Sequence, residues 1–317
     1  MPAVHGIIPP LVTPLLADGS LDEAGLINVV DRVIEGGVHG LFVLGTTGEW
    51  ASLDDRVRRR VIDVCGEATM GRVPSYVHVT ETRVNASLAL ARHAADAGAT
   101  AIVVAAPYYL PLQQAELLDY VHFLLDHQSL PVVLYNIPQF VKTQYELDTV
   151  ARLITNPRVL AVKDSSGDLA YQRKLVDLAA DHPHFAVLSG NEAHMVEMLQ
   201  YGTHGCVGGG AHLLPRLLVS LFHAAVAGDV GQTETLHEEL RRLSALYDGP
   251  TVAASIGNVK TALHQLGVIA TDQMCAPYGT ASRGRGVRDV LHTVGLLKDG
   301  VTKPSNGQYH AAAHDAI

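Results

Sequence analysis

Two side chains that can do covalent or proton-transfer chemistry stand at the ends of apolar runs. Lys163 lies between VLAV and DSSGD, and Tyr135 follows VVL. Lysine is rarely buried without a partner, so one interpretation of Lys163 is a solvated residue at the end of a surface strand. A surface strand alternates apolar and polar residues, however, and this run does not. The alternative is that the strand carries an amine to a site where an amine is needed.

An amine at such a site has a defined chemistry. A lysine attacks a carbonyl carbon only as the neutral amine, and removal from water favours that form. With a ketone it forms a Schiff base, and the protonated imine withdraws electrons from the adjacent carbon. That carbon can then be deprotonated, or its bond to the next carbon can break. A phenol such as Tyr135 can carry the proton between a substrate hydroxyl and solvent.

The sequence GTTGE (45–49) offers a second chemical feature. Gly45, Thr46 and Thr47 follow the apolar run GLFVL and precede a helical pattern, so their backbone N–H groups and hydroxyls can form a nest for a carboxylate. An ordinary glycine–threonine turn is the alternative. For Glu49 we expect a structural role in holding the turn rather than a catalytic one. A carboxylate nest beside an amine points to a 2-oxo acid as substrate.

The elements that must position these residues are short, wholly apolar strands separated by helical patterns. This alternation predicts a parallel sheet covered by helices, and eight repeats favour an α/β fold of the (β/α)8 TIM barrel type. A doubly wound sheet is the alternative, but no G-x-G-x-x-G follows the first strand. The expected strands are 7–15, 40–45, 75–79, 101–107, 131–138, 159–164, 185–190 and 205–210.

The strand signals stop after Pro215, and helical patterns follow near 215–247, 253–266 and 285–297. We therefore expect a barrel over residues 1–226, a C-terminal helical extension over 227–299 and a flexible tail over 300–317. His310 and His314 in that tail have the spacing of two metal ligands on one helix face, but at a loose terminus we interpret them as a stray pair.

The bulk composition excludes several classes of function. The 317 residues are 48% hydrophobic and 17% charged, with a net charge of −9. These values are typical of a compact globular protein and argue against a nucleic-acid partner. Three scattered cysteines fit a reducing compartment. The N-terminus has no basic region typical of a signal peptide, and no apolar run has membrane-spanning length. We expect a soluble cytoplasmic protein.

Several motifs together carry a family resemblance. GLFVLGTTGE, the PYY pair, YNIP and VLAVKDSSGD, in this order and spacing, resemble the dihydrodipicolinate synthase / N-acetylneuraminate lyase family of class I pyruvate-dependent aldolases. The similarity extends over about residues 5 to 295. It implies that Lys163 is the Schiff-base lysine and that neither a metal nor a cofactor takes part.

The resemblance also implies individual roles. Thr46 and Thr47 would bind the carboxylate of pyruvate, and Tyr135 would relay protons above the imine. Tyr109 matches a family tyrosine that reaches into the active site of a neighbouring subunit, which implies a homotetramer built as a dimer of dimers. Val207 would turn its backbone carbonyl toward the bound keto acid.

Four positions depart from relatives or leave specificity open. Phe140 stands where the lysine-biosynthesis synthase has an arginine for the carboxylate of aspartate semialdehyde, which argues against that activity. Gly209 stands where sialic acid lyases have a serine, within a GGG run that widens the pocket. Asn191 and Glu192, in SGNE, could contact a polyol, or could instead cap a helix.

These observations predict an aldolase that reversibly cleaves a 2-keto-3-deoxy sugar acid into pyruvate and an aldehyde. A dehydratase or hydratase-aldolase on the same imine is the alternative, and Phe140 would suit an aromatic aldehyde there. True dihydrodipicolinate synthase activity and a non-catalytic 2-oxo-acid-binding protein are further alternatives. The sequence does not select the aldehyde.

Overall fold

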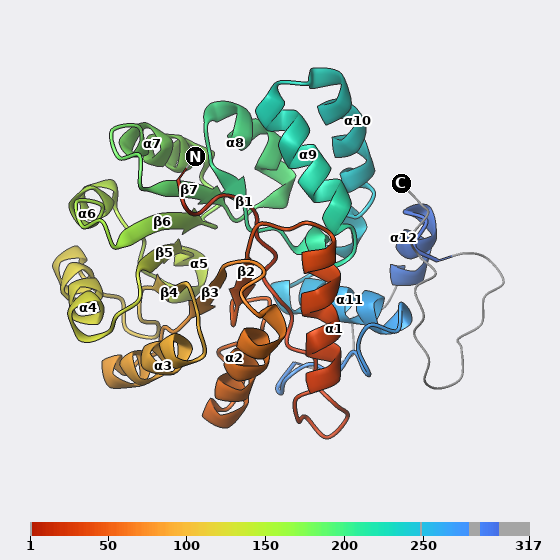
Figure 1. Cartoon of the computed structure of the whole chain (residues 1–317), viewed down its shortest axis with the longest axis horizontal. Helices are drawn as coiled ribbons and strands as arrows, with labels where there is room; N and C mark the ends of the chain where they lie inside the picture. Colours follow the sequence, from red (N-terminus) through yellow and green to blue (C-terminus); the bar gives the residue numbers. More distant parts are fainter. Residues whose placement is uncertain (1, 248, 279–285, 298–317) are drawn as a thin grey trace.

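The computed structural model describes residues 2–247, 249–278 and 286–297. The tail over 300–317, with His310 and His314, lies outside the described residues. Figure 1 shows a ring of strands surrounded by helices, with further helices packed on one side.

The sheet consists of eight parallel strands, and this confirms the predicted barrel. They are β1 (Gly6–Ile7), β2 (Leu41–Val43), β3 (Ser75–His78), β4 (Ala101–Ala105), β5 (Val132–Asn136), β6 (Val159–Asp164), β7 (Ala186–Ser189) and β8 (Gly205–Cys206).

The ring closes between β1 and β2. β1 pairs with β8 at one side, and beyond its end Pro10 forms a parallel bridge to Phe42 of β2. The N–H of Leu11 donates to the carbonyl of Phe42 at 2.9 Å, and the N–H of Phe42 donates to the carbonyl of Pro9 at 3.0 Å. Closure leaves no open sheet edge to pair with another chain.

The first and last strands are shorter than the sequence predicts. The expected strand 7–15 contains three prolines, which cannot donate ladder hydrogen bonds, so regular pairing ends at Ile7. The expected strand 205–210 ends at Cys206, and its glycines lead into a 3-10 turn, η2 (Gly209–His212).

Amphipathic helices cover the outside of the barrel. In α2, for example, Val57 and Val61 are buried, while Arg60 on the outer face forms a two-pronged ion pair with Glu23 of α1 at 2.7 Å. The covering helices are α1 (Glu23–Glu35), α2 (Asp55–Thr69), α3 (Val84–Asp96), α4 (Gln114–His127), α6 (Leu147–Leu153), α7 (Leu169–Ala179), α8 (Met195–Tyr201) and α9 (Pro215–Ala227), and a short α5 (Pro138–Val141) follows β5.

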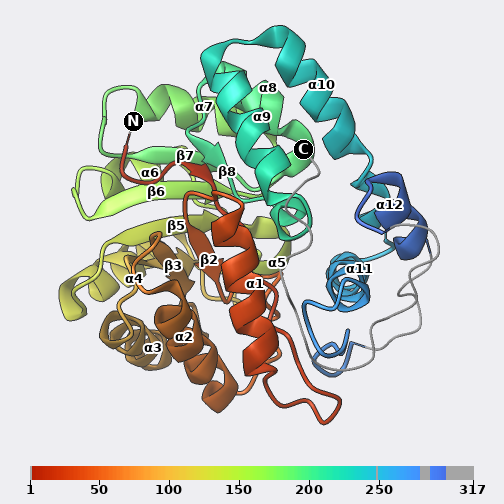
Figure 2. The ribbon, with the colours of Figure 1, turned by 45° about the vertical axis from the view of Figure 1, so that its right-hand side comes forward.

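The C-terminal helices form a second group, seen at the right in Figure 2. The stretch predicted as continuous over 215–247 is broken, because Gly228 adopts a left-handed conformation (φ 72°) at the end of α9. Glycine commonly ends helices in this way, since it has no Cβ to clash. The elements after it are α10 (Val230–Arg241), η3 (Ser244–Leu246), α11 (Val252–Gln265) and α12 (Val287–Thr293).

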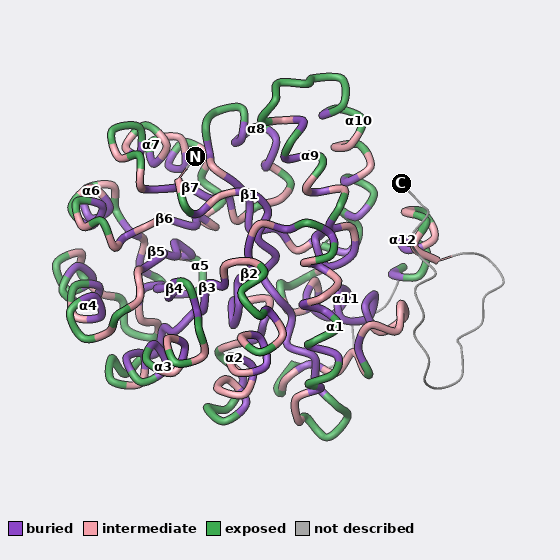
Figure 3. The backbone as a smooth tube through the Cα atoms, in the orientation of Figure 1, coloured by how far each residue is buried: buried purple, intermediate pink, exposed green. Residues whose placement is uncertain are grey.

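The core is continuous through the barrel. The strands are buried and the outer faces of the helices are exposed, as Figure 3 shows. This burial on both faces of the sheet explains why the strands are apolar throughout instead of alternating. Within the described residues, no helix combines the length and the apolar character needed to cross a membrane.

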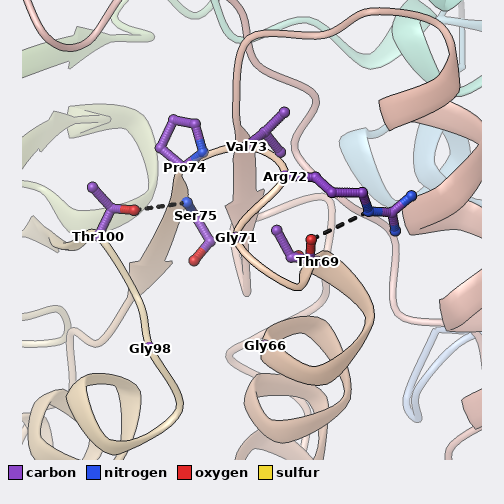
Figure 4. A pocket seen from close by; sticks show the side chains of 9 residues that line it. All are labelled: Gly66, Thr69, Gly71, Arg72, Val73, Pro74, Ser75, Gly98 and Thr100. Atoms are coloured by element: carbon purple, nitrogen blue, oxygen red, sulfur yellow. Dashed lines mark hydrogen bonds between the residues drawn. The ribbon is translucent and has the colours of Figure 1, made fainter.

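A shallow hollow opens at the N-terminal ends of the strands (Figure 4). There the N–H of Ser75 donates to Thr100 Oγ1 at 3.2 Å. Arg72 is held by the carbonyl of Thr69 and by the carboxylate of Asp31. Because chemistry in this fold is found at the C-terminal ends of the strands, we assign no function to this hollow.

Candidate active site

Lys163 lies inside the barrel mouth. Its partner in the register between β5 and β6 is Tyr135, and residues paired in this way point to the same face of a sheet. Lys163 is only 5% exposed and Tyr135 only 2%. The solvated alternative for Lys163 is therefore wrong, because the strand buries its amine.

Two aromatic rings enclose the amine. Lys163 Nζ lies 4.1 Å from the centre of the Tyr135 ring and 4.2 Å from the centre of the Phe42 ring. The two rings meet edge to face at 5.6 Å. A cation is attracted to ring faces at this distance. Phe42, on β2, thus completes the immediate surroundings of the lysine.

A polar network behind the strands fixes the ends of β5 and β6. Asn136 Nδ2 donates to Asp164 Oδ1 at 2.8 Å, and Ser166 Oγ donates to Asp164 Oδ2 at 3.1 Å. Burial raises the pKa of Asp164, while the hydrogen bonds from Asn136 and Ser166 oppose that rise. Since Asn136 and Asp164 directly follow Tyr135 and Lys163, this network helps to fix the position of both candidate side chains.

The turn after β2 has a strained backbone. Leu44 and Glu49, which flank the residues GTTG, both have positive φ values, at 58° and 57°. Side chains disfavour this conformation, and it persists only where surrounding contacts impose it. Gly45 and Gly48 permit the tight turn, because a Cβ on Gly45 would lie 2.4 Å from the Phe42 ring and one on Gly48 would lie 3.0 Å from the carbonyl oxygen of Leu11.

Glu49 holds this turn through the C-terminal helices, as expected of a structural residue. Its Oε1 accepts from Lys260 Nζ at 2.5 Å, and its Oε2 accepts from the N–H of Cys275 at 2.7 Å. Lys260, on α11, is completely buried and also donates to the carbonyl of Gln273. A buried ion pair between distant parts of the chain therefore anchors the turn.

The turn presents hydrogen-bonding groups to the mouth. Thr46 Oγ1 lies 3.2 Å from the hydroxyl of Tyr135. The backbone N–H groups of Thr46 and Thr47 make no hydrogen bond to any described residue, and both residues are half-buried. These groups can receive a carboxylate next to the amine.

The two candidate polyol contacts have different surroundings. Asn191 is exposed and caps η1 (Glu192–His194) by accepting from the N–H of Ala193, so the capping alternative holds for it. Glu192 instead turns toward the β8 loop, where its Oε2 accepts from the N–H of Gly210 at 2.8 Å. A Cβ on Gly208 or Gly210 would lie within 2.4 Å of this carboxyl group. The glycine run therefore makes room for Glu192.

Burial raises the pKa of Glu192 to about 7, and the Gly210 hydrogen bond partly opposes the rise. A carboxyl whose pKa is higher in the folded than in the unfolded state stabilises the fold least at high pH. The stability associated with this group is present below its ordinary pKa of 4.5 and is lost as the pH rises through about 7. As the pH is raised from 5 to 8, the melting temperature of Glu192→Gln should therefore rise relative to that of the wild type. A difference in melting temperature that stays constant over this pH range would contradict the assignment.

The remaining predicted residues lie around the mouth. Val207 is buried directly after β8, and its N–H donates to the carbonyl of Ser189 at 2.8 Å. Gly209 faces Tyr247, whose hydroxyl would lie 3.1 Å from a Cβ at that position. Phe140 on α5 is 46% exposed. Tyr109 is 77% exposed with a φ of 84°, so within one chain it stays outside the buried group.

Four residues near the site were not found by sequence reasoning: Phe42, His78, Lys260 and Tyr247. For His78 a signal was present, because it is a titratable residue inside an apolar strand, as Lys163 is. Phe42 could not be distinguished from its apolar neighbours. Lys260 and Tyr247 belong to the C-terminal region, and no local pattern relates that region to the barrel mouth.

Comparison with known proteins agrees with this geometry. The chain belongs to the Dihydrodipicolinate synthetase family, which it matches over residues 3–289. It is 33% identical over 266 residues to the 4-hydroxy-tetrahydrodipicolinate synthase of Methanothrix thermoacetophila, covering 84% of this chain and 88% of that protein. It is 32% identical over 244 residues to Escherichia coli YagE, provisionally named a 2-dehydro-3-deoxy-D-gluconate aldolase, covering 76% and 81%.

Solved structures are also similar. The dihydrodipicolinate synthase of Bacteroides thetaiotaomicron aligns with a TM-score of 0.85 at 38% identity, over 92% of this chain and 98% of that one. YagE of Escherichia coli K12, in complex with pyruvate, aligns with a TM-score of 0.86 at 29% identity, over 92% and 99%. The relatives thus include proteins named as synthases and one provisionally named as an aldolase.

Proposed function

We propose that this protein is a class I aldolase that forms a Schiff base between Lys163 and a 2-oxo acid. The observation that carries the proposal is the buried amine at the end of β6, enclosed by Phe42 and Tyr135. The hydroxyl pair of Thr46 and Tyr135, and the turn N–H groups that have no partner among the described residues, support a keto acid whose carboxylate lies beside the imine.

The proposed reaction is reversible cleavage of a 2-keto-3-deoxy sugar acid to pyruvate and an aldehyde. Tyr135 takes the proton of the substrate hydroxyl as the carbon–carbon bond breaks, and the electrons pass into the imine to give an enamine. The enamine carbon then takes up a proton, returned through Tyr135, which restores the imine, and water hydrolyses this imine and releases pyruvate from Lys163. No metal is needed, so activity should persist in the presence of a chelator.

There are two alternatives to the proposed aldolase: a dehydratase or hydratase-aldolase that uses the same imine, and a binding protein that catalyses no reaction. A dehydratase or hydratase-aldolase is favoured by the exposed Phe140, whose ring would suit an aromatic aldehyde. Product analysis separates the reactions, since pyruvate with an aldehyde indicates an aldolase and a dehydrated keto acid indicates a dehydratase. A non-catalytic 2-oxo-acid-binding protein would give neither product.

The proposed assembly is a homotetramer built as a dimer of dimers. Tyr109 and Leu110 expose 77% and 70% of their surface next to each other in the loop after β4. Large apolar side chains exposed together are typical of an interface. In this assembly Tyr109 would reach the active site of the neighbouring subunit.

Aspartate semialdehyde is expected to be a poor partner for pyruvate. Phe140 offers no charge to its carboxylate, and a lost charge-assisted hydrogen bond is worth about 1.5–3 kcal/mol, or roughly ten- to over a hundredfold in rate. The measurement is kcat/KM for condensation of pyruvate with aspartate semialdehyde and with neutral aldehydes. Phe140→Arg should raise kcat/KM for aspartate semialdehyde and should not raise it for the neutral aldehydes. If aspartate semialdehyde is the best substrate of the wild type, another cation, such as Lys142, must reach the site.

A further inference from the structure

His78, the last residue of β3, is buried in the barrel interior without a side-chain partner for its ring nitrogens. It is 1% exposed, and neither ring nitrogen makes a hydrogen bond of good geometry to a residue that the structure describes, although the backbone of Leu44 lies near enough to influence the ring. An unsatisfied polar group in a protein interior costs free energy, so its presence calls for an explanation other than stability.

The surroundings of His78 place it beside the proposed site. Its ring lies edge to face with the ring of Tyr135, at 5.8 Å between centres, and Tyr135 also contacts the amine of Lys163. On another side the ring of Trp50 lies 4.5 Å away, and Trp50 in turn contacts Tyr108 at 5.2 Å. Trp50 and Tyr108 are both half-buried.

His78 is neutral in this position. Burial, together with the positive charges of Lys163 and Arg58, lowers its pKa to about 3, although the backbone of Leu44 opposes the shift. Arg58 is itself paired with Glu81. The ring therefore has one N–H donor and one nitrogen acceptor at all ordinary pH values.

A hydroxyl group matches this pair of functions. It can donate to one group and accept from another, whereas a carboxylate accepts only and an aromatic ring does neither well. We propose that His78 hydrogen-bonds a hydroxyl group on the aldehyde half of the substrate, and so selects hydroxylated aldehydes. This assignment rests on the proposed function, because it requires the keto acid to be bound at Lys163.

The geometry allows such a contact. The imine carbon is bonded to Lys163 Nζ, which lies against the Tyr135 ring, and His78 lies against the same ring. A carbon–carbon bond is about 1.5 Å long, so in the proposed contact an aldehyde of a few carbons extends from the imine past the Tyr135 ring toward the imidazole.

The test compares His78→Leu with His78→Asn. Leucine has a similar volume and no polar atom, while asparagine keeps one donor and one acceptor. Three measurements are made on each variant and on the wild type: borohydride trapping of pyruvate, melting temperature, and kcat/KM for condensation of pyruvate with glyceraldehyde and with propionaldehyde, which lacks the hydroxyls.

The expected result is a selective loss. His78→Leu should trap pyruvate as the wild type does and melt at the same or a higher temperature, because an unsatisfied group has been removed. Its kcat/KM with glyceraldehyde should fall about ten- to a hundredfold, while that with propionaldehyde should change little. His78→Asn should recover part of the glyceraldehyde activity.

Other outcomes overturn the assignment. Equal changes with the two aldehydes, or no change, would show that His78 does not recognise a hydroxyl. A lower melting temperature in both variants with no selective loss would make His78 a packing residue. If the wild type traps no pyruvate, the proposed function itself fails, and this result is distinct because it does not depend on residue 78.

Discussion

Lys163→Met is expected to abolish catalysis while leaving the fold intact. Without the amine no imine can form, and loss of a covalent nucleophile costs on the order of 10⁴-fold or more in kcat. Methionine fills a similar volume between the Phe42 and Tyr135 rings, so the melting temperature should hold or rise. The measurement is turnover of keto acid substrates together with thermal unfolding.

Borohydride trapping gives the same prediction a direct readout. The wild type reduced in the presence of pyruvate should carry one three-carbon acid per chain, located at Lys163 by peptide mass spectrometry. Lys163→Met should carry none. The matched control is Lys174→Met, which changes an exposed lysine of α7 and should behave as the wild type. An adduct on another lysine, or full activity in Lys163→Met, would disprove the mechanism.

Lys260→Met is expected to be the most destabilising single change outside the barrel. It leaves the Glu49 carboxylate buried without its cation. Breaking a buried ion pair in this way costs about 3–5 kcal/mol. The turn carrying Thr46 and Thr47 should loosen as well, so KM for pyruvate should rise. Thermal or denaturant unfolding measures the first effect, and initial rates measure the second.

A second substitution tests the cause of this effect. In Glu49→Gln/Lys260→Met the buried charge is gone, and the glutamine oxygen can still accept from the N–H of Cys275. The double variant should therefore be more stable than Lys260→Met alone. If the double variant is the less stable of the two, or if Lys260→Met melts like the Lys174→Met control, the ion pair does not hold the turn.

The consequence of this arrangement is that the C-terminal helices take part in forming the site. α11 provides Lys260, and the preceding segment provides Tyr247 over Gly209. The barrel strands place the lysine and the phenol, but the turn that we propose to bind the carboxylate is held by residues that follow the barrel in the sequence. We therefore expect truncation before α11 to impair keto-acid binding even where the strands persist.

The strands and the residues at their ends follow from local sequence patterns. Uninterrupted apolar runs separated by helical patterns identify a parallel sheet covered by helices, because both faces of each strand are buried. Each run can be recognised from its own residues, so the signal is local. Such a sheet gathers the C-terminal ends of its strands at one mouth. The position of Lys163 after VLAV and of Tyr135 after VVL is therefore sufficient to bring them together.

The surroundings of these two residues depend instead on how the whole chain packs. Phe42 is one of several apolar residues in its strand, and the register between strands selects it for contact with Lys163. Glu49 and Lys260 are separated by 211 positions in the sequence, and helix packing that no local period encodes brings them together. The sequence at 208 to 210 predicts a pocket widened by glycines, whereas in the structure Gly208 and Gly210 make room for Glu192 and Gly209 faces Tyr247. Periodicity reports which face of an element is buried, whereas the partner across that face depends on register and packing, which form only when the whole barrel closes.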